Sequence, residues 1–356
     1  MSSTPTDVAA VPSVPSQPNR SHSHFLSLPD LAARSAGGAV LWANDDLFAE
    51  KENLINAAPA EFRPATFGHK GQIYDGWETR RRRGTTADSH DSVIVRLGVP
   101  GLVRGVVVDT AWFTGNYPPQ ISVEAAYVEG YPSVDELVEK TTWTTIVERS
   151  GVNGDTRNPF KVNSTQRWSH VRLSIYPDGG VARFRVHGEG LLNPDFAEDM
   201  TLDLAAMENG GRITACSNMF YSSPNNLVLP GTPRTMGDGW ETSRRRDAGN
   251  DWVQMHLAGH GLLNAIELDT SYFVGNAPGS ARLRGRESVD DDWFDILPTT
   301  ELLPDTRHRF RVHDERPITQ TRLDIFPDGG MARVRLFGKL TAQGLDDIRK
   351  AWDASA

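Results

Sequence analysis

Two copies of one charged pentapeptide bring together side chains that are well suited to chemistry. Residues 75–79 read Asp-Gly-Trp-Glu-Thr and precede four arginines at 80–83. The same pentapeptide recurs at 238–242, followed by one serine and three more arginines. Arginine binds a carboxylate through two parallel hydrogen bonds, and a nearby carboxylate can act as a general base. Each copy can therefore supply a cation for an anionic ligand and a group for proton transfer.

The arginines of one run cannot all point the same way. In an extended segment Arg80 and Arg82 share one face, while Arg81 and Arg83 share the other. One pair could face a ligand while the other forms ion pairs within the protein. The alternative is a solvated edge strand held by salt bridges. The duplication favours the ligand interpretation, because both copies keep an acid-Gly-Trp-acid frame beside the arginines.

A second pair of candidates, His90 and Asp91, follows the first arginine run. An Asp held beside a His can orient or activate a general base. Neighbours in an extended chain point apart, which disfavours a direct pair. The alternative is a surface-loop histidine followed by an aspartate that caps a turn.

Three further candidates lie where a strand-like run ends. Asp109 closes an apolar run, and Asn116 and Tyr117 follow Gly115 in a turn-prone segment. Asp109 and Asn116 could contact a ligand as an acceptor and an amide, or they could only shape the turn. The second copy has Ala277 in place of the tyrosine, so Tyr117 is a candidate for any difference between the halves. The possible second-repeat counterparts of the candidate residues are Asp238, Glu241, Arg244, Arg245, Asp269 and Asn276.

The motifs of the first half of the chain recur in the same order in the second half. The spacing between matching residues falls from 173 for Asn53 and Asn226 to 150 for Pro177 and Pro327. The second half has therefore lost residues in its loops, as a duplicated scaffold would. A chain of 356 residues also exceeds the size at which one hydrophobic core stops growing. Two homologous domains are expected.

Many short strand-like runs separated by turn residues predict an all-β sandwich in each half. We expect separate strands at 93–99 and 103–109, divided by Pro100-Gly101. Residues 171–176 and 181–186 are expected to form a hairpin around Pro-Asp-Gly-Gly, with Ala182, Phe184 and Val186 facing the core. Short helices are expected within 45–57 and at 345–352.

Composition narrows the class of protein. The net charge of −9 argues against a general nucleic-acid binder. The single cysteine, Cys216, excludes an intrachain disulfide and suits a reducing compartment, so a cytoplasmic location is expected. No apolar run approaches the length of a membrane span, and 1–24 is expected to be a disordered tail. No cofactor or metal motif is present, although a divalent metal bound by distant residues is left open.

Together these motifs closely resemble the allantoicase (allantoate amidinohydrolase) family over about 28–340. One departure is Ser92, where an aromatic residue such as Trp252 of the second copy is expected. The segments that carry the resemblance are 74–81, 90–91, 96–101, 104–105, 109–119, 238–242, 269–276 and 327–333.

The resemblance implies two tandem jelly-roll domains of the galactose-binding-like type. We place the first repeat at 25–195, a linker at 196–210 and the second repeat at 211–356. The resemblance also implies hydrolysis of allantoate to ureidoglycolate and urea in allantoin and purine degradation. It further implies that the protein forms a homo-oligomer. The alternatives are a non-catalytic jelly-roll module for a small polar ligand, or a hydrolase of a related ureido acid.

Allantoate carries a carboxylate and two ureido groups, and the candidates have groups that match each of them. Arg80, Arg81 and Arg82 would bind the carboxylate, and Asp109, Asn116 and Tyr117 would contact the ureido groups. The candidates for acid and base are Glu78, Asp75, His90 and Asp91. A carboxylate beside arginines stays ionised and suits the base role. Whether the repeats share one site, or one repeat is only structural, is left open.

Overall fold

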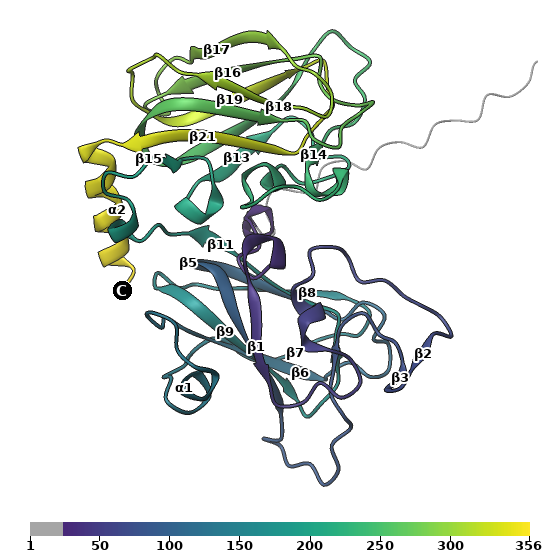
Figure 1. The fold of residues 1–356 in the computed structure, drawn as a ribbon. Helices are drawn as coiled ribbons and strands as arrows, with labels where there is room; N and C mark the ends of the chain where they lie inside the picture. Colours follow the sequence, from purple (N-terminus) through teal and green to yellow (C-terminus); the bar gives the residue numbers. More distant parts are fainter. Residues whose placement is uncertain (1–23) are drawn as a thin grey trace, which may run out of the picture.

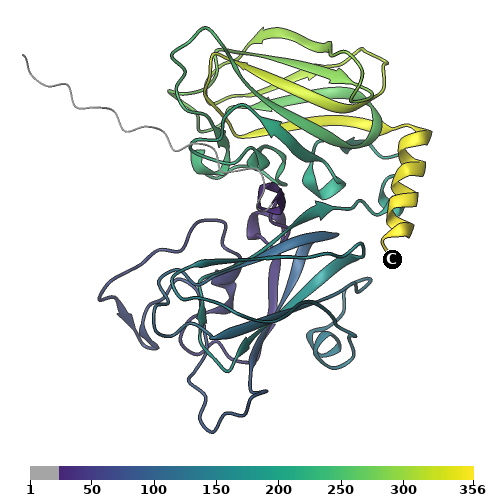
Figure 2. The same ribbon diagram turned by 180° about the vertical axis from the view of Figure 1, so that it is seen from behind.

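The computed structural model describes residues 24–356, so nearly all of the predicted tail at 1–24 lies outside the described residues. Two β-sandwiches lie one above the other, and the C-terminal helix α2 (Ala342–Ala354) runs along one side of them (Figures 1 and 2). The predicted all-β architecture of two tandem jelly-roll sandwiches is confirmed. Within 24–356, no helix is long and apolar enough to cross a membrane.

The first repeat is built around one long strand, β5. Its 3-10 helices are η1 (His24–Ser27), η2 (Arg34–Ala36) and η3 (Lys51–Ile55), and its α-helix is α1 (Val134–Glu139). Its strands are β1 (Ala39–Ala43), β2 (Phe67–Gly68), β3 (Gly71–Gln72), β4 (Trp77–Glu78), β5 (Asp91–Asp109), β6 (Gln120–Ala126), β7 (Thr144–Gly151), β8 (Arg157–Lys161), β9 (Arg167–Tyr176), β10 (Gly180–Val181) and β11 (Arg183–Gly190).

The second repeat has the same plan around β15. Its 3-10 helices are η5 (Met207–Asn209), η6 (Pro224–Val228) and η7 (Met236–Asp238), preceded by η4 (Pro194–Phe196). Its strands are β12 (Leu202–Asp203), β13 (Arg212–Cys216), β14 (Trp240–Glu241), β15 (Asp251–Asp269), β16 (Ser280–Arg286), β17 (Phe294–Glu301), β18 (Arg307–Arg311), β19 (Ile318–Phe326), β20 (Gly330–Met331) and β21 (Arg333–Leu340). Part of the predicted linker, β12, pairs with β21 of this repeat.

The prediction of a turn at Pro100-Gly101 is wrong. Residues 91–109 form the single strand β5, whose first part pairs with β1 and β9 and whose last part pairs with β11 and β8. Pairing with β9 jumps from Arg96 to Gly101, and the proline lies in this gap. Proline lacks an N–H, so it is tolerated where the strand changes partners. One strand thereby joins the two layers of the sandwich.

The prediction that 171–176 and 181–186 pair as a hairpin is also wrong. β9 pairs with β5 and β6, whereas β11 pairs with β5, so the turn leads from one layer to the other. The prediction that Ala182, Phe184 and Val186 face the core is confirmed, since all three are fully buried. Arg183, on the opposite side of the strand, is nearly as buried. It is buried because it contacts Ala58 and Asp75 on that side, where it also lines the region between the repeats.

Contacts from α2 fix one repeat on the other. Arg167 of the first repeat donates to the carbonyl oxygens of Trp352 and Ser355, at the end of this helix. Its guanidinium also stacks over the rings of Tyr127 and Trp352, at 4.4 and 4.2 Å. The last carbonyls of a helix lack partners within the helix, so a cation placed there is favourable. The region between the repeats is thus a defined part of the fold.

Candidate functional site

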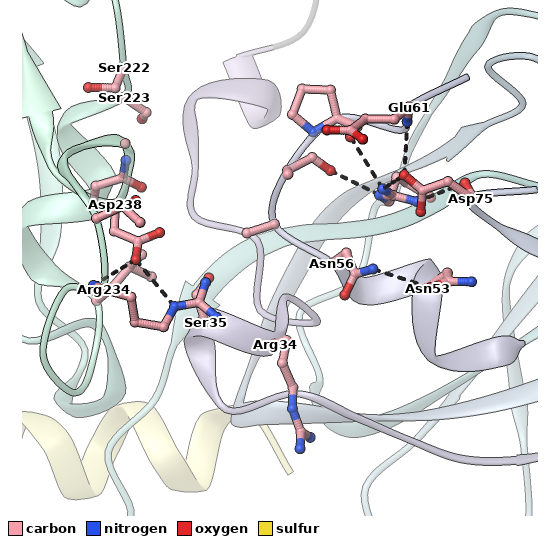
Figure 3. A pocket seen from close by; sticks show the side chains of 18 of the residues that line it. Arg34, Ser35, Asn53, Asn56, Glu61, Asp75, Ser222, Ser223, Arg234 and Asp238 are labelled. Atoms are coloured by element: carbon pink, nitrogen blue, oxygen red, sulfur yellow. Dashed lines mark hydrogen bonds and ion pairs between the residues drawn. The ribbon is translucent and has the colours of Figure 1, made fainter. Parts of the chain in front are cut away.

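A cleft of about 1090 Å³ lies between the two repeats (Figure 3). Three corresponding pairs of residues from the repeats line it: Asn53 and Asn226, Asp75 and Asp238, Arg183 and Arg333. In Figure 3, Asp75 lies on one wall and Asp238 on the opposite wall. The first residue of the repeated pentapeptide therefore faces the same cleft in both copies.

The rest of the pentapeptide explains this placement. Trp77 and Trp240 are fully buried, and their indole N–H groups donate to backbone oxygens at 2.8 Å. A Cβ on Gly76 would lie 2.7 Å from the carbonyl oxygen of Val181, so only glycine allows this close approach of the backbones. The tryptophan anchors the segment in the core, and the aspartate is left at the surface of the cleft.

The cleft carries a positive balance of charge in an acidic protein. Its arginines outnumber its carboxylates five to three. The arginines are Arg34, Arg63, Arg183, Arg234 and Arg333, and the carboxylates are Glu61, Asp75 and Asp238. Low-dielectric walls strengthen such a field inside a cleft. The cleft is therefore suited to a small anion.

Both aspartates of the cleft are held in their ionised form. Burial raises the pKa of Asp75, but hydrogen bonds from Arg183 and from the Glu61 backbone outweigh it, so the net pKa is lowered. For Asp238, burial is likewise outweighed by the backbone N–H and the guanidinium of Arg234, at 2.9 and 3.3 Å, and its pKa is lowered. Both can accept protons or hydrogen bonds at neutral pH.

The first arginine run lies in a separate pocket of about 370 Å³. Arg80 forms an ion pair with Asp45, and the Nε of Arg82 donates to the buried Asp91 at 3.0 Å. Arg81 is exposed and has no side-chain partner among residues 24–356. Two of the three candidate arginines, Arg80 and Arg82, therefore have structural partners.

The second repeat shows the same pattern of ion pairs. Arg245 donates to the buried Asp251 at 2.8 Å, and Arg244 is exposed. An arginine held by the first aspartate of the long strand is therefore common to both repeats. This similarity favours the structural alternative for Arg82 and Arg245.

His90 and Asp91 do not form a pair. The Nδ1 of His90 lies 2.8 Å from the carbonyl oxygen of Asp88, and its exposed ring lies beside Tyr176. Asp91 instead accepts from Asn44 at 2.7 Å and from Arg82. Adjacent residues at the start of a strand point to opposite sides, which separates the two groups.

Glu78 and Asn116 are brought together at the rim of the first sandwich, outside the cleft. The Nδ2 of Asn116 donates to Oε1 of Glu78 at 2.7 Å, and Asn276 donates to Glu241 at the same distance. The Oε2 of Glu78 is buried without a partner among the described residues. Burial raises the pKa of Glu78, and the hydrogen bond from Asn116 only partly opposes it.

Because of this burial, we expect Glu78→Gln to change the stability of the protein. A carboxyl group with a raised pKa in the folded state opposes folding as pH rises above the pKa of the unfolded chain, and does so fully above the raised value. The neutral amide keeps an acceptor for Asn116, so we expect the variant to melt at a higher temperature than the wild type at pH 8. The difference should vanish near pH 4. Scanning calorimetry across this range, with Glu241→Gln as the matched control, measures the effect; a Glu78→Gln variant less stable at pH 8 would contradict it.

Asp109 and Tyr117 have local structural contacts. Asp109 accepts from the backbone N–H of Ala111 at 2.9 Å, and Asp269 accepts from Ser271 in the same way at 2.8 Å. Tyr117 is half-buried against the core, and its ring lies over Gly154. The contacts of the two aspartates match the turn-capping alternative. Neither Asp109 nor Tyr117 lines the cleft.

A protein-family model described as "Allantoicase repeat" matches residues 29–191 and 202–341. The chain belongs to the allantoicase family. It is 58% identical over 317 residues to a probable allantoicase of Nocardia farcinica, covering 89% of this chain and 95% of that one. It is 39% identical over 326 residues to an allantoicase of Dictyostelium discoideum, covering 86% of each. The crystal structure of allantoicase from Saccharomyces cerevisiae aligns with a TM-score of 0.76 at 32% identity, covering 88% of this chain and 96% of that one.

Two arginines that line the cleft, one in each repeat, were not among the candidates predicted from the sequence. Arg183 and Arg333 each follow the motif Pro-Asp-Gly-Gly-x-Ala in their repeat. The signal was an arginine directly after a fully buried alanine, on the side of the strand away from the core, in both copies. Within 24–356, no three His, Cys, Asp or Glu side chains are grouped to hold a metal ion.

Proposed function

We propose that this protein hydrolyses allantoate to ureidoglycolate and urea in the degradation of allantoin, and that the reaction takes place in the cleft between the repeats. One observation carries the choice of site. The pentapeptide aspartate and the closing-strand arginine of both repeats line a single cleft in which arginines outnumber carboxylates. Family membership over both repeats supports the reaction.

The cleft provides groups for each part of the substrate. A guanidinium can bind the carboxylate through two hydrogen bonds. The ureido N–H groups can donate to the carboxylates of Asp75, Asp238 or Glu61, and Asn53 and Asn226 offer amide groups. Every polar part of allantoate therefore has a matching partner on the cleft walls.

One ionised carboxylate can balance the reaction. As the oxygen of water bonds to the central carbon, Asp238 takes a proton from the water. The carbon–nitrogen bond breaks, and the departing nitrogen keeps the bonding electrons. It then receives the proton from Asp238, so that urea leaves neutral and the carboxylate is restored. The lowered pKa of Asp238 keeps its carboxylate ionised, as the first of these proton transfers requires.

Release of urea from allantoate tests this proposal. Purified protein should produce urea and an equal amount of ureidoglycolate, which is followed through its conversion to glyoxylate. A faster reaction with ureidoglycolate than with allantoate would favour a related ureido acid as the substrate. Folded protein that releases no urea above background, with or without added divalent metal ions, would contradict the proposal.

Two expectations about the assembly and its location stay predictions. A homo-oligomer is expected from the family resemblance, and light scattering of the purified protein tests it. A cytoplasmic location is expected from the single cysteine, Cys216, which is half-buried at the end of β13.

A further inference from the structure

The two walls of the cleft differ in the length of one loop. Asp75 follows Asn53 by 22 positions, whereas Asp238 follows Asn226 by 12. The first repeat therefore has ten more residues between η3 and the pentapeptide, and this longer segment contains the small hairpin of β2 and β3 (Figure 1). Outside this segment, the lining residues Asn53, Asp75 and Arg183 correspond to Asn226, Asp238 and Arg333.

In the first repeat, the longer loop satisfies Arg183. The carbonyl oxygens of Ala58 and Pro59 accept from its Nε and Nη2 at 2.9 and 3.3 Å. Asp75 accepts from Nη1 through its backbone oxygen and from Nη2 through its carboxylate, at 3.0 and 2.7 Å. The backbone N–H of Glu61 completes the cluster by donating to the same carboxylate. Every nitrogen of this guanidinium has a partner within the repeat.

In the second repeat, Arg333 keeps only one of these contacts, the donation to the backbone oxygen of the pentapeptide aspartate. It is 4% exposed, and only its Nη1 donates, to the backbone oxygens of Asp238 and Ala332 at 2.7 Å. Its Nε is buried without a partner among the described residues, and its Nη2 donates to none of them. The carboxylate of Asp238 is engaged by Arg234 instead. A buried guanidinium on the cleft wall is therefore left without a direct counter-ion from the part of the chain that the structure describes.

A second polar group on the same wall also lacks a partner. The hydroxyl of Ser222 is buried without a hydrogen bond among the described residues, and it lines the cleft. The corresponding residue of the first repeat, at the spacing of 173, is Ala49. Burying polar groups without partners costs free energy, which a ligand that supplies the partners can recover. The unsatisfied groups gather on the wall of the second repeat.

The surroundings of Arg333 keep it charged. The pKa of Arg333 is lowered to about 10, mainly by burial and also by nearby Arg335, while Asp238, Asp269 and Glu208 act in the opposite direction through space. None of these three carboxylates forms an ion pair with it among residues 24–356. At neutral pH the group is a buried cation with free donors.

We propose that Arg333 binds the carboxylate of the substrate, so that the second repeat forms the binding wall of the cleft and the Arg183–Asp75 pair is structural. This assignment rests on the proposed hydrolysis of allantoate. It deepens that function by placing the substrate anion on one of two corresponding arginines. The ten-residue difference in loop length explains why the duplicated arginines have separate roles.

Binding of two substrate analogues, one charged and one neutral, tests the assignment without turnover. Ureidoacetate keeps the carboxylate and one ureido group of allantoate, whereas ureidoacetamide has a neutral amide in place of the carboxylate. Titration calorimetry should show that the wild type prefers ureidoacetate. In Arg333→Gln this preference should fall by about tenfold to a hundredfold, as expected for hydrogen bonds to a charged group. The KM for allantoate should rise by a similar factor.

Two further variants separate binding from folding. Arg333→Lys keeps the charge but not the fork, so it should retain a weakened preference for ureidoacetate, and it replaces Arg333→Gln if that variant does not fold. The matched Arg183→Lys should mainly lower the melting temperature. A wild type without the preference, or an Arg333 variant that keeps it in full, would overturn the assignment. If the wild type then still released urea from allantoate, the hydrolysis itself would stay supported. If Arg333→Gln lost the preference but the wild type released no urea, the anion site would be supported and the reaction contradicted.

Discussion

Asp238→Asn is expected to lower kcat for allantoate by about a hundredfold to ten-thousandfold, the usual contribution of a general base. The amide has nearly the same shape as the carboxylate and can still accept from the backbone N–H of Arg234. It cannot take a proton from water. Steady-state measurement of urea release at pH 7 gives kcat and KM separately, and we expect the loss to appear mainly in kcat.

Stability provides the control for this variant. The Arg234 side chain that pairs with Asp238 is 78% exposed, and exposed ion pairs contribute about 0–1 kcal/mol. The melting temperature of Asp238→Asn should therefore stay close to that of the wild type. A correctly folded Asp238→Asn variant with near wild-type kcat would remove Asp238 from the mechanism.

The corresponding change in the first repeat, Asp75→Asn, is expected to act on stability. It leaves the guanidinium of Arg183, which is 2% exposed, without its counter-charge. We expect a loss of about 3 kcal/mol in the free energy of unfolding, near the lower end for breaking a buried ion pair, because the carbonyl partners of Arg183 remain. Unfolding in guanidinium chloride at pH 7 measures this loss.

The pH dependence of the Asp75 effect has a defined sign. The folded state lowers the pKa of Asp75, so its contribution is present above the pKa of the unfolded chain and is lost as pH falls through the lowered value. The difference between Asp75→Asn and the wild type should therefore shrink at strongly acidic pH. Loss of activity in Asp75→Asn equal to that in Asp238→Asn, with unchanged stability, would instead indicate two equivalent half-sites.

Much of the fold could be predicted because the deciding signals are local. Alternation along 181–186 placed Ala182, Phe184 and Val186 in the core, and the repeated pentapeptide revealed the duplication. The continuity of β5 could not be predicted in this way. Pro100-Gly101 is a strong local turn signal, and it is overridden by partners that lie far away in sequence, on β9 and β11.

The site was predictable only in part. Asp75 and Asp238 reach the cleft because the tryptophans two positions further along, Trp77 and Trp240, are buried. Their partners are distant, since Arg183 and Arg333 lie 108 and 95 positions further along the chain. The arginine run gave the stronger local signal for an anion site. Its partner Asp45, at a separation of 35 positions, could not be paired with Arg80 by inspection of the sequence.

A crystal structure of the protein with bound ureidoacetate would test the central claim most directly, because it distinguishes the cleft from the arginine runs. We predict ligand density in the cleft between the repeats, with the carboxylate within hydrogen-bonding distance of Nε and Nη2 of Arg333 and the ureido group near Asp238. Density in the pocket of Arg80–Arg83, or beside Arg244 and Arg245, with an empty cleft, would contradict the account.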